Sequence, residues 1–243
     1  MANPAIPLED RLIVALDVAS VADARARVER LGDSVRFYKI GLQLQFAGGI
    51  EFARELIAAG KKVFLDAKLL DIDQTVAGAV ASIAALGVDF VTVHGHGATI
   101  AAAVAGRGTS RLKILSVTAL TSLDAHDMAE LGLTCSVQDL VLKRVRTALD
   151  AGADGVVASG EEAKAIRALA GARLLVVTPG IRSEGVPQDD QKRTATPRQA
   201  IATGADYLVV GRQILRDPDP PGAARQIIGE IAAGLAAARG SGR

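Results

Sequence analysis

Aromatic residues are scarce in this chain of 243 residues: they make up 3% of it, and tryptophan is absent. Apolar residues nevertheless account for 49% of the chain. The hydrophobic core must therefore be built mainly from Val, Ile, Leu and Ala, and we expect branched aliphatic side chains to fill it. A chain of this length can bury a large single core.

Three further shortages exclude broad classes of function. The single cysteine, Cys135, cannot form an internal disulfide, which indicates a reducing, cytoplasmic location. The 28 basic and 27 acidic residues give a net charge of +1, so neither nucleic acid nor a membrane surface is an expected partner. No apolar run approaches the roughly 20 residues of a membrane span, and residues 1–11 contain no signal-peptide core. A small anionic ligand remains possible, since it needs only a few local cations.

Eight short apolar runs alternate with longer, Ala-rich amphipathic stretches. The runs are residues 12–16, 37–40, 62–66, 90–94, 113–118, 155–158, 174–178 and 207–210. Most are apolar almost throughout, as expected of parallel strands that are buried on both faces. The intervening stretches have helical periodicity, as in residues 21–31. Eight such units predict an α/β fold, a single (β/α)8 TIM barrel over residues 1–243.

Three of the predicted helix–strand joints share a Gly–small–Asp pattern, at residues 87–89, 152–154 and 204–206. Glycine suits the end of a helix because it accepts a left-handed backbone, so the repeat supports repeating βα units. Residues 180–195 form a long polar loop after the seventh predicted strand, which we interpret as a candidate lid over the C-terminal face. The tail from about residue 236 to residue 243 is expected to be frayed.

Charged side chains gather at the ends of the first three predicted strands. Asp66 and Lys68 stand at i and i+2, so both should project into the barrel mouth. Lys39 closes the preceding strand, where a lysine is costly to bury unless it is paired, and Asp71 follows in the next loop. We predict that these four residues form an alternating charge array, in which Lys68 stays protonated and can act as a general acid. Asp17, after the first strand, could hydrogen-bond sugar hydroxyls or cap a helix.

The end of the eighth predicted strand has the features of a phosphate site. Gly211 would let the backbone approach a phosphate, and Arg212 could bind it through two hydrogen bonds. Barrels often bind phosphate after strands seven and eight. His94 and His96 could ligate zinc, but no third ligand is evident, and a rim histidine is the favoured interpretation. We therefore expect no metal.

Together, the motifs resemble the bacterial orotidine 5′-monophosphate decarboxylases, from about residue 12 to residue 231. The matching segments are residues 13–18, 39–43, 66–68, 71–72, 75–76, 120–122, 177–182, 190–191 and 210–212. No single segment is decisive, but their combination and order are specific. The resemblance implies a barrel that converts orotidine 5′-monophosphate to uridine 5′-monophosphate, the last step of de novo pyrimidine nucleotide synthesis, without a cofactor.

The resemblance also implies roles for individual residues. Lys68 would protonate C6 of the pyrimidine, and Asp66 would lie against the leaving carboxylate. Lys39 and Asp17 would contact the ribose hydroxyls and belong to the charge array. Asp71 and Thr75 would reach the site of the neighbouring subunit, which requires a homodimer. The remaining substrate-binding positions would be Thr121 and Ser122 at the pyrimidine, Gln191 between phosphate and base, Pro179, and Arg182, Gly211 and Arg212 at the phosphate.

One segment departs from the family pattern. The family usually has His in place of Leu70 and Pro-Asn in place of Asp73 and Gln74, which puts the conformation of this turn and the subunit packing in question. Two other interpretations stay open. In related metal-dependent sugar-phosphate lyases, the carboxylates at the positions of Asp66 and Asp71 would bind Mg²⁺. A catalytically silent, nucleotide-binding barrel is the second alternative.

Overall fold

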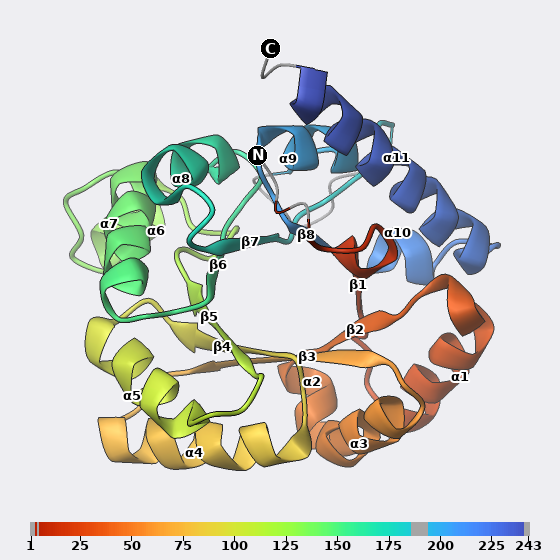
Figure 1. Ribbon diagram of the computed structural model, residues 1–243, viewed down its shortest axis with the longest axis horizontal. Coiled ribbons are helices and arrows are strands. Elements are labelled where there is room, and N and C mark those ends of the chain that lie inside the picture. Colours follow the sequence, from red (N-terminus) through yellow and green to blue (C-terminus); the bar gives the residue numbers. More distant parts are fainter. Residues whose placement is uncertain (1–2, 4, 186–193, 241–243) are drawn as a thin grey trace.

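The computed structural model describes residues 3, 5–185 and 194–240. Within these residues, parallel strands pair in sequence order and β1 pairs with β8, so the sheet closes into a barrel (Figure 1). The strands are β1 (Leu12–Ala15), β2 (Phe37–Ile40), β3 (Lys62–Leu69), β4 (Phe90–His94), β5 (Lys113–Val117), β6 (Gly155–Val157), β7 (Leu175–Thr178) and β8 (Tyr207–Val210). The predicted (β/α)8 fold is confirmed, and each predicted run overlaps one strand, although β3 extends beyond its run to Leu69.

Helices cover the outside of the barrel (Figure 1). They are α1 (Val21–Leu31), α2 (Leu42–Leu44), α3 (Ile50–Ala58), α4 (Asp73–Leu86), α5 (Gly97–Arg107), α6 (Ala125–Glu130), α7 (Val137–Asp150), α8 (Ala163–Ala170), α9 (Pro197–Thr203), α10 (Arg212–Leu215) and α11 (Pro220–Gly240). None of the described helices is long and apolar enough to cross a membrane. The expectation of a frayed tail is wrong for residues 236–240, because α11 continues to Gly240.

The Gly–small–Asp repeat has a structural function that spacing alone does not predict. Each Asp comes directly before β4, β6 or β8. Its carboxylate accepts a hydrogen bond from a backbone N–H near the start of the neighbouring strand β3, β5 or β7. The pairs are Asp89 with Val63, Asp154 with Ile114 and Asp206 with Val176, each at 2.9 Å. The repeat therefore ties neighbouring strands together at the N-terminal end of the barrel. Asp206 is fully buried and also pairs with Arg167 at 2.7 Å.

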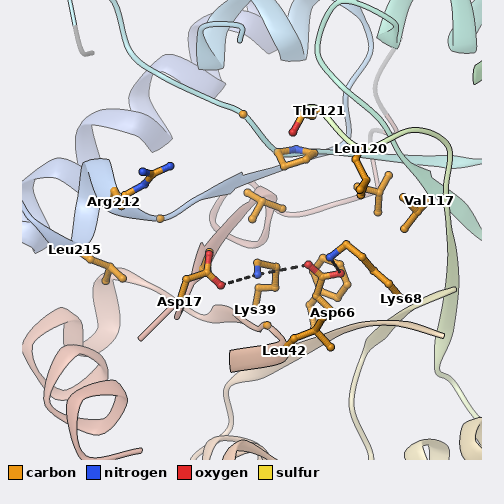
Figure 2. A pocket seen from close by; sticks show the side chains of 18 of the residues that line it. Asp17, Lys39, Leu42, Asp66, Lys68, Val117, Leu120, Thr121, Arg212 and Leu215 are labelled. Carbon is orange, nitrogen blue, oxygen red and sulfur yellow. Dashed lines mark hydrogen bonds and ion pairs between the residues drawn. The ribbon is translucent and has the colours of Figure 1, made fainter. Parts of the chain in front are cut away.

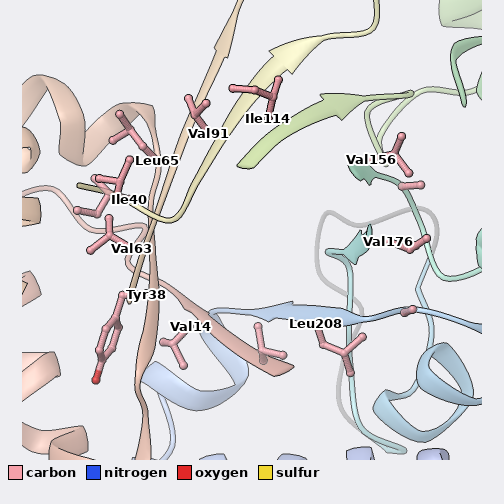
Figure 3. Packing of buried hydrophobic residues seen from close by; sticks show 14 of the residues in the cluster. Val14, Tyr38, Ile40, Val63, Leu65, Val91, Ile114, Val156, Val176 and Leu208 are labelled. Atoms are coloured by element: carbon pink, nitrogen blue, oxygen red, sulfur yellow. The ribbon is translucent and has the colours of Figure 1, made fainter. Parts of the chain in front are cut away.

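Outward-facing strand residues form an aliphatic layer between the sheet and the helices (Figure 3). Val14, Val63, Val91 and Val176, for example, are all fully buried there. This layer matches the composition, which is rich in aliphatic residues and poor in aromatic ones. Because parallel strands alternate their side chains, the residues between these positions point into the barrel.

The barrel interior differs from the expected aliphatic filling. Phe37, Phe64, Phe90 and Tyr207 pack there, with neighbouring ring centroids 5.0 to 6.0 Å apart. Aliphatic side chains complete this interior cluster, among them Ile13, Leu115 and Val177. Four of the seven aromatic residues of the chain thus form the floor of the barrel mouth.

Candidate active site

The charged residues stand one layer above this aromatic floor. Lys39 follows Phe37 by two residues on β2, and Asp66 follows Phe64 by two residues on β3, so both point into the barrel. They line a pocket of about 590 Å³ at the C-terminal ends of the strands (Figure 2). A volume of this size suits a small organic ligand.

Lys39 is buried between two carboxylates. Its Nζ lies 2.9 Å from Oδ1 of Asp17 and 3.5 Å from Oδ2 of Asp66, and the residue is only 8% exposed (Figure 2). Burial alone would lower the pKa of Lys39, but Asp66 and Asp17 outweigh it and hold that pKa above its ordinary value. Burial likewise opposes ionisation of Asp66, yet Lys39 and Lys68 bring its pKa below the ordinary value. Both groups are therefore charged at neutral pH.

Lys68 approaches the same carboxylate from the other side. Its Nζ lies 2.8 Å from Oδ1 of Asp66, so Asp66 is held between two ammonium groups. Regular strand alternation does not produce this arrangement. The register between β3 and β4 shifts between Leu65 and Leu69, and Lys68 adopts φ +48°. Both side chains line the mouth, and a bulge rather than a straight strand brings them there.

Asp71 does not line the pocket of its own chain, and its predicted contribution across a subunit interface stays a prediction. The residue is exposed, and its Oδ1 accepts the backbone N–H of Ile72 rather than binding Lys68. Thr75 is also exposed, near the start of α4. Neither residue lines the pocket of its own chain. The described array is therefore Asp17–Lys39–Asp66–Lys68.

Most of the other predicted binding positions do line the pocket. They are Thr121, Pro179, Arg182, Gly211 and Arg212. Thr121 and Arg212 lie on the far wall of the pocket from the lysines (Figure 2). Ser122 is exposed and is not a lining residue. Gln191, the predicted bridge between phosphate and base, lies outside the described residues.

The base of the candidate lid is anchored to the barrel. Ile181 and Ala195 form a parallel β-bridge across the two ends of the loop, and Arg182 is 8% exposed behind it. Ser183 accepts a hydrogen bond from Gln213 of α10 at 2.7 Å. The loop thus starts and ends at the pocket rim, next to the helix that begins with Arg212.

Several residues of the site were not predicted from the sequence. Arg27 and Arg216 also line the pocket and bring the arginines in its wall to four, with Arg182 and Arg212. Thr92 hydrogen-bonds to Asp66. Arg27 stands in the middle of an amphipathic helix, and Thr92 within an apolar strand, so nothing in the local pattern distinguishes them from surface and core residues.

The pocket therefore combines a cationic wall with an alternating array of charges around buried Lys39, at the C-terminal face of a TIM barrel. No group of three His, Cys, Asp or Glu side chains able to hold a metal occurs in the part of the chain that the structure describes. Such a site suits a small anionic ligand and a reaction in which charge develops next to Asp66 and Lys68.

Comparison with known proteins identifies the family. The model of the orotidine 5′-phosphate decarboxylase / HUMPS family matches residues 10–227, and the chain belongs to this family. Curated relatives named orotidine 5′-phosphate decarboxylase include that of Nitrobacter winogradskyi, 55% identical over 93% of this chain and 94% of the relative. Another, from Afipia carboxidovorans, is 57% identical over 95% of this chain and 97% of the relative. A solved orotidine 5′-phosphate decarboxylase from Lactobacillus acidophilus superposes with a TM-score of 0.81, at 35% identity over 91% of this chain and 99% of that structure.

Proposed function

We infer that this chain is a carboxy-lyase that decarboxylates orotidine 5′-monophosphate to uridine 5′-monophosphate, a reaction of pyrimidine nucleotide biosynthesis. Relatives that are at least 54% identical to this chain are named orotidine 5′-phosphate decarboxylase. The structural observation that best supports the inference is the ammonium of Lys68, 2.8 Å from a buried carboxylate at the barrel mouth. The lone Cys135, which is unpaired, supports a cytoplasmic location.

We propose that Lys68 is the proton donor. The bond between C6 and the carboxylate carbon breaks, CO₂ leaves, and the electron pair remains on C6. The Lys68 ammonium then transfers a proton to C6 and later recovers one from water. Before this transfer, its charge stabilises the growing negative charge on C6. Asp66, ionised and buried, would repel the substrate carboxylate that lies against it.

We propose that the arginine-lined wall binds the 5′-phosphate. A guanidinium can donate two hydrogen bonds to a phosphate and keeps its charge at any physiological pH. Arg212 and Arg182 flank the loop ends that anchor the candidate lid. Binding of a remote phosphate would then help to close the candidate lid, of which residues 186–193 lie outside the described residues, and align the base above Lys68. Asp17, 60% exposed in its side chain, is free to accept hydrogen bonds from the ribose.

We propose that the enzyme acts as a homodimer in which Asp71 and Thr75 complete the partner's site. Within one chain both residues are exposed and lie outside the pocket. Exposed apolar side chains surround them: Leu70 is 61% exposed and Ile72 is 71% exposed. Exposed apolar residues next to polar residues that line no pocket in their own chain are typical of a subunit interface. Leu70 would thus contribute apolar contact area, which accounts for the departure at this turn.

The activity is tested by the loss of orotidine 5′-monophosphate absorbance in the presence and absence of EDTA. Rapid loss that EDTA does not affect is expected. Turnover that disappears with EDTA and returns with Mg²⁺ would instead support the metal-dependent lyase. Lys68→Ala should abolish turnover while the protein keeps its melting temperature within about 3 °C, and a substantially active Lys68→Ala enzyme would exclude its assigned role.

The dimer proposal is tested by mixing two inactive variants, Lys68→Ala and Asp71→Asn. If Asp71 acts across the interface, each mixed dimer contains one intact site, and mixing restores activity. If Asp71 acts within its own chain, neither site of a mixed dimer is intact, and mixing restores nothing. A protein that stays active as a monomer would also exclude the proposal.

A further inference from the structure

Thr92 is a buried polar residue in the otherwise apolar strand β4. It follows Phe90 by two residues, as Lys39 follows Phe37 and Asp66 follows Phe64, so it points into the barrel in the layer of the charge array. It is 0% exposed. A buried hydroxyl must be satisfied by hydrogen bonds or it destabilises the fold.

The Thr92 hydroxyl binds both proposed catalytic residues of β3. Its Oγ1 accepts the backbone N–H of Lys68 at 3.0 Å and donates to Oδ1 of Asp66 at 2.8 Å. A hydroxyl has one hydrogen, and a backbone N–H can only donate. The directions are therefore unambiguous: the carboxylate receives the hydroxyl hydrogen, next to the ammonium of Lys68.

The backbone bond compensates for the bulge in β3. Between the paired residues Leu65 and Leu69, β3 advances by four residues while β4 advances by two. The ladder cannot satisfy the Lys68 N–H across this gap. Lys68 is also the one non-glycine residue with positive φ in the described chain, a backbone conformation that side chains other than glycine rarely adopt. Thr92 provides the missing acceptor at this strained residue.

We propose that Thr92 is a positioning residue, whose hydroxyl fixes the bulge that turns Asp66 and Lys68 toward the substrate. Without it, the Lys68 backbone could relax toward a regular strand, and the ammonium would leave its place beside the carboxylate. The catalytic consequence depends on the proposed function, but the effect on the β3 backbone does not.

The test compares Thr92→Val, which replaces the hydroxyl with a methyl group of similar size, with Thr92→Ser, which keeps the hydroxyl. A displacement of about 1 Å at a reacting group can cost about 100-fold in rate. We expect Thr92→Val to lower kcat about 10- to 100-fold with KM nearly unchanged, and Thr92→Ser to restore most of the rate. Thr178→Val is the matched control, because Thr178 is equally buried on β7 and the structure gives its hydroxyl no hydrogen bond.

Amide hydrogen exchange supplies a readout that does not depend on turnover. The Lys68 amide should lose protection in Thr92→Val and keep it in Thr92→Ser and Thr178→Val. A wild-type protein that does not decarboxylate the substrate, but shows this exchange pattern, would exclude the proposed function and leave the positioning role intact. Unchanged Lys68 protection, a wild-type kcat in Thr92→Val, or failure of Thr92→Ser to restore the rate would overturn the positioning role.

Discussion

Replacing Lys39 by methionine should weaken the fold in a pH-dependent manner. The substitution keeps an unbranched side chain and removes the ammonium that lies 2.9 Å from Asp17 and 3.5 Å from Asp66. Breaking a buried ion pair costs about 3–5 kcal/mol when the remaining charge has no other partner. Asp66 keeps Lys68, and Asp17 is 60% exposed in its side chain, so water can solvate it. We therefore expect a smaller loss of unfolding free energy, about 1–3 kcal/mol at neutral pH.

The pH dependence follows from the pKa of Asp66. Lys39 and Lys68 bring this pKa below 3.8 against the opposing effect of burial, so the stabilisation is present above pH 3.8 and is lost as pH falls through the folded value. Without Lys39, the pKa of Asp66 rises and acid destabilisation begins at a higher pH. Lys39 itself does not titrate in this window, because its pKa is raised above 10.5 and its contribution is lost only at higher pH.

Urea unfolding followed by circular dichroism, from about pH 4 to about pH 8, measures both effects. Lys113→Met is the control: Lys113 is 47% exposed in its side chain, and its partner Asp154 keeps Arg107 and a backbone N–H. We expect the control to lose about 0–1 kcal/mol, with little change in pH dependence. Equal losses in the two variants, or parallel pH profiles for Lys39→Met and the wild type, would refute the buried array.

Three further predictions address the fold, the phosphate and the interface. Asp206→Ala leaves Arg167, whose side chain is 9% exposed, without its ion pair and should cost about 3–5 kcal/mol in urea unfolding; a loss of about 1 kcal/mol or less would show that the repeat does not stabilise the barrel. Arg212→Ala should weaken uridine 5′-monophosphate binding about 10- to 100-fold in calorimetry but leave uridine binding unchanged, and equal effects on both ligands would exclude a phosphate role. Ile72→Asp should shift the protein toward monomer in sedimentation, whereas Leu131→Asp, at a similarly exposed residue, should not.

The barrel and the proximity of Lys39 to Asp66 could be predicted from the sequence, because both follow from where the apolar runs end. Lys39 and Asp66 each close an apolar run, and the carboxyl ends of parallel strands meet at one face, so their proximity follows from order and period alone. The position of Asp71 could not be predicted in the same way. Its neighbours in one chain do not include the lysines, and local spacing carries no information about which surface a second chain covers.

The sequence gives no sign of the bulge in β3. The predicted strand, residues 62–66, has ordinary alternation that continues to Lys68, and the left-handed backbone of Lys68 is a conformation that local preference disfavours. It persists because Thr92 on the neighbouring strand compensates for it, and a threonine in a strand is also the expected residue for strand propensity. The sequence of one segment cannot predict a strained backbone conformation that a residue on another strand stabilises.

The register of the strands connects these observations to the chemistry. On β2 and β3, a ring of the aromatic floor and a residue of the charge array are two positions apart, so the alternation that places Phe37 at the base also places Lys39 in the pocket above it. A slip of one residue would turn Lys39 and Asp66 into the aliphatic layer, where no carboxylate or ammonium could pair with them. The rings therefore do more than fill space. They close the barrel beneath the array, which keeps the effective dielectric low around Asp66 and strengthens the electrostatic interactions on which a reaction at C6 depends.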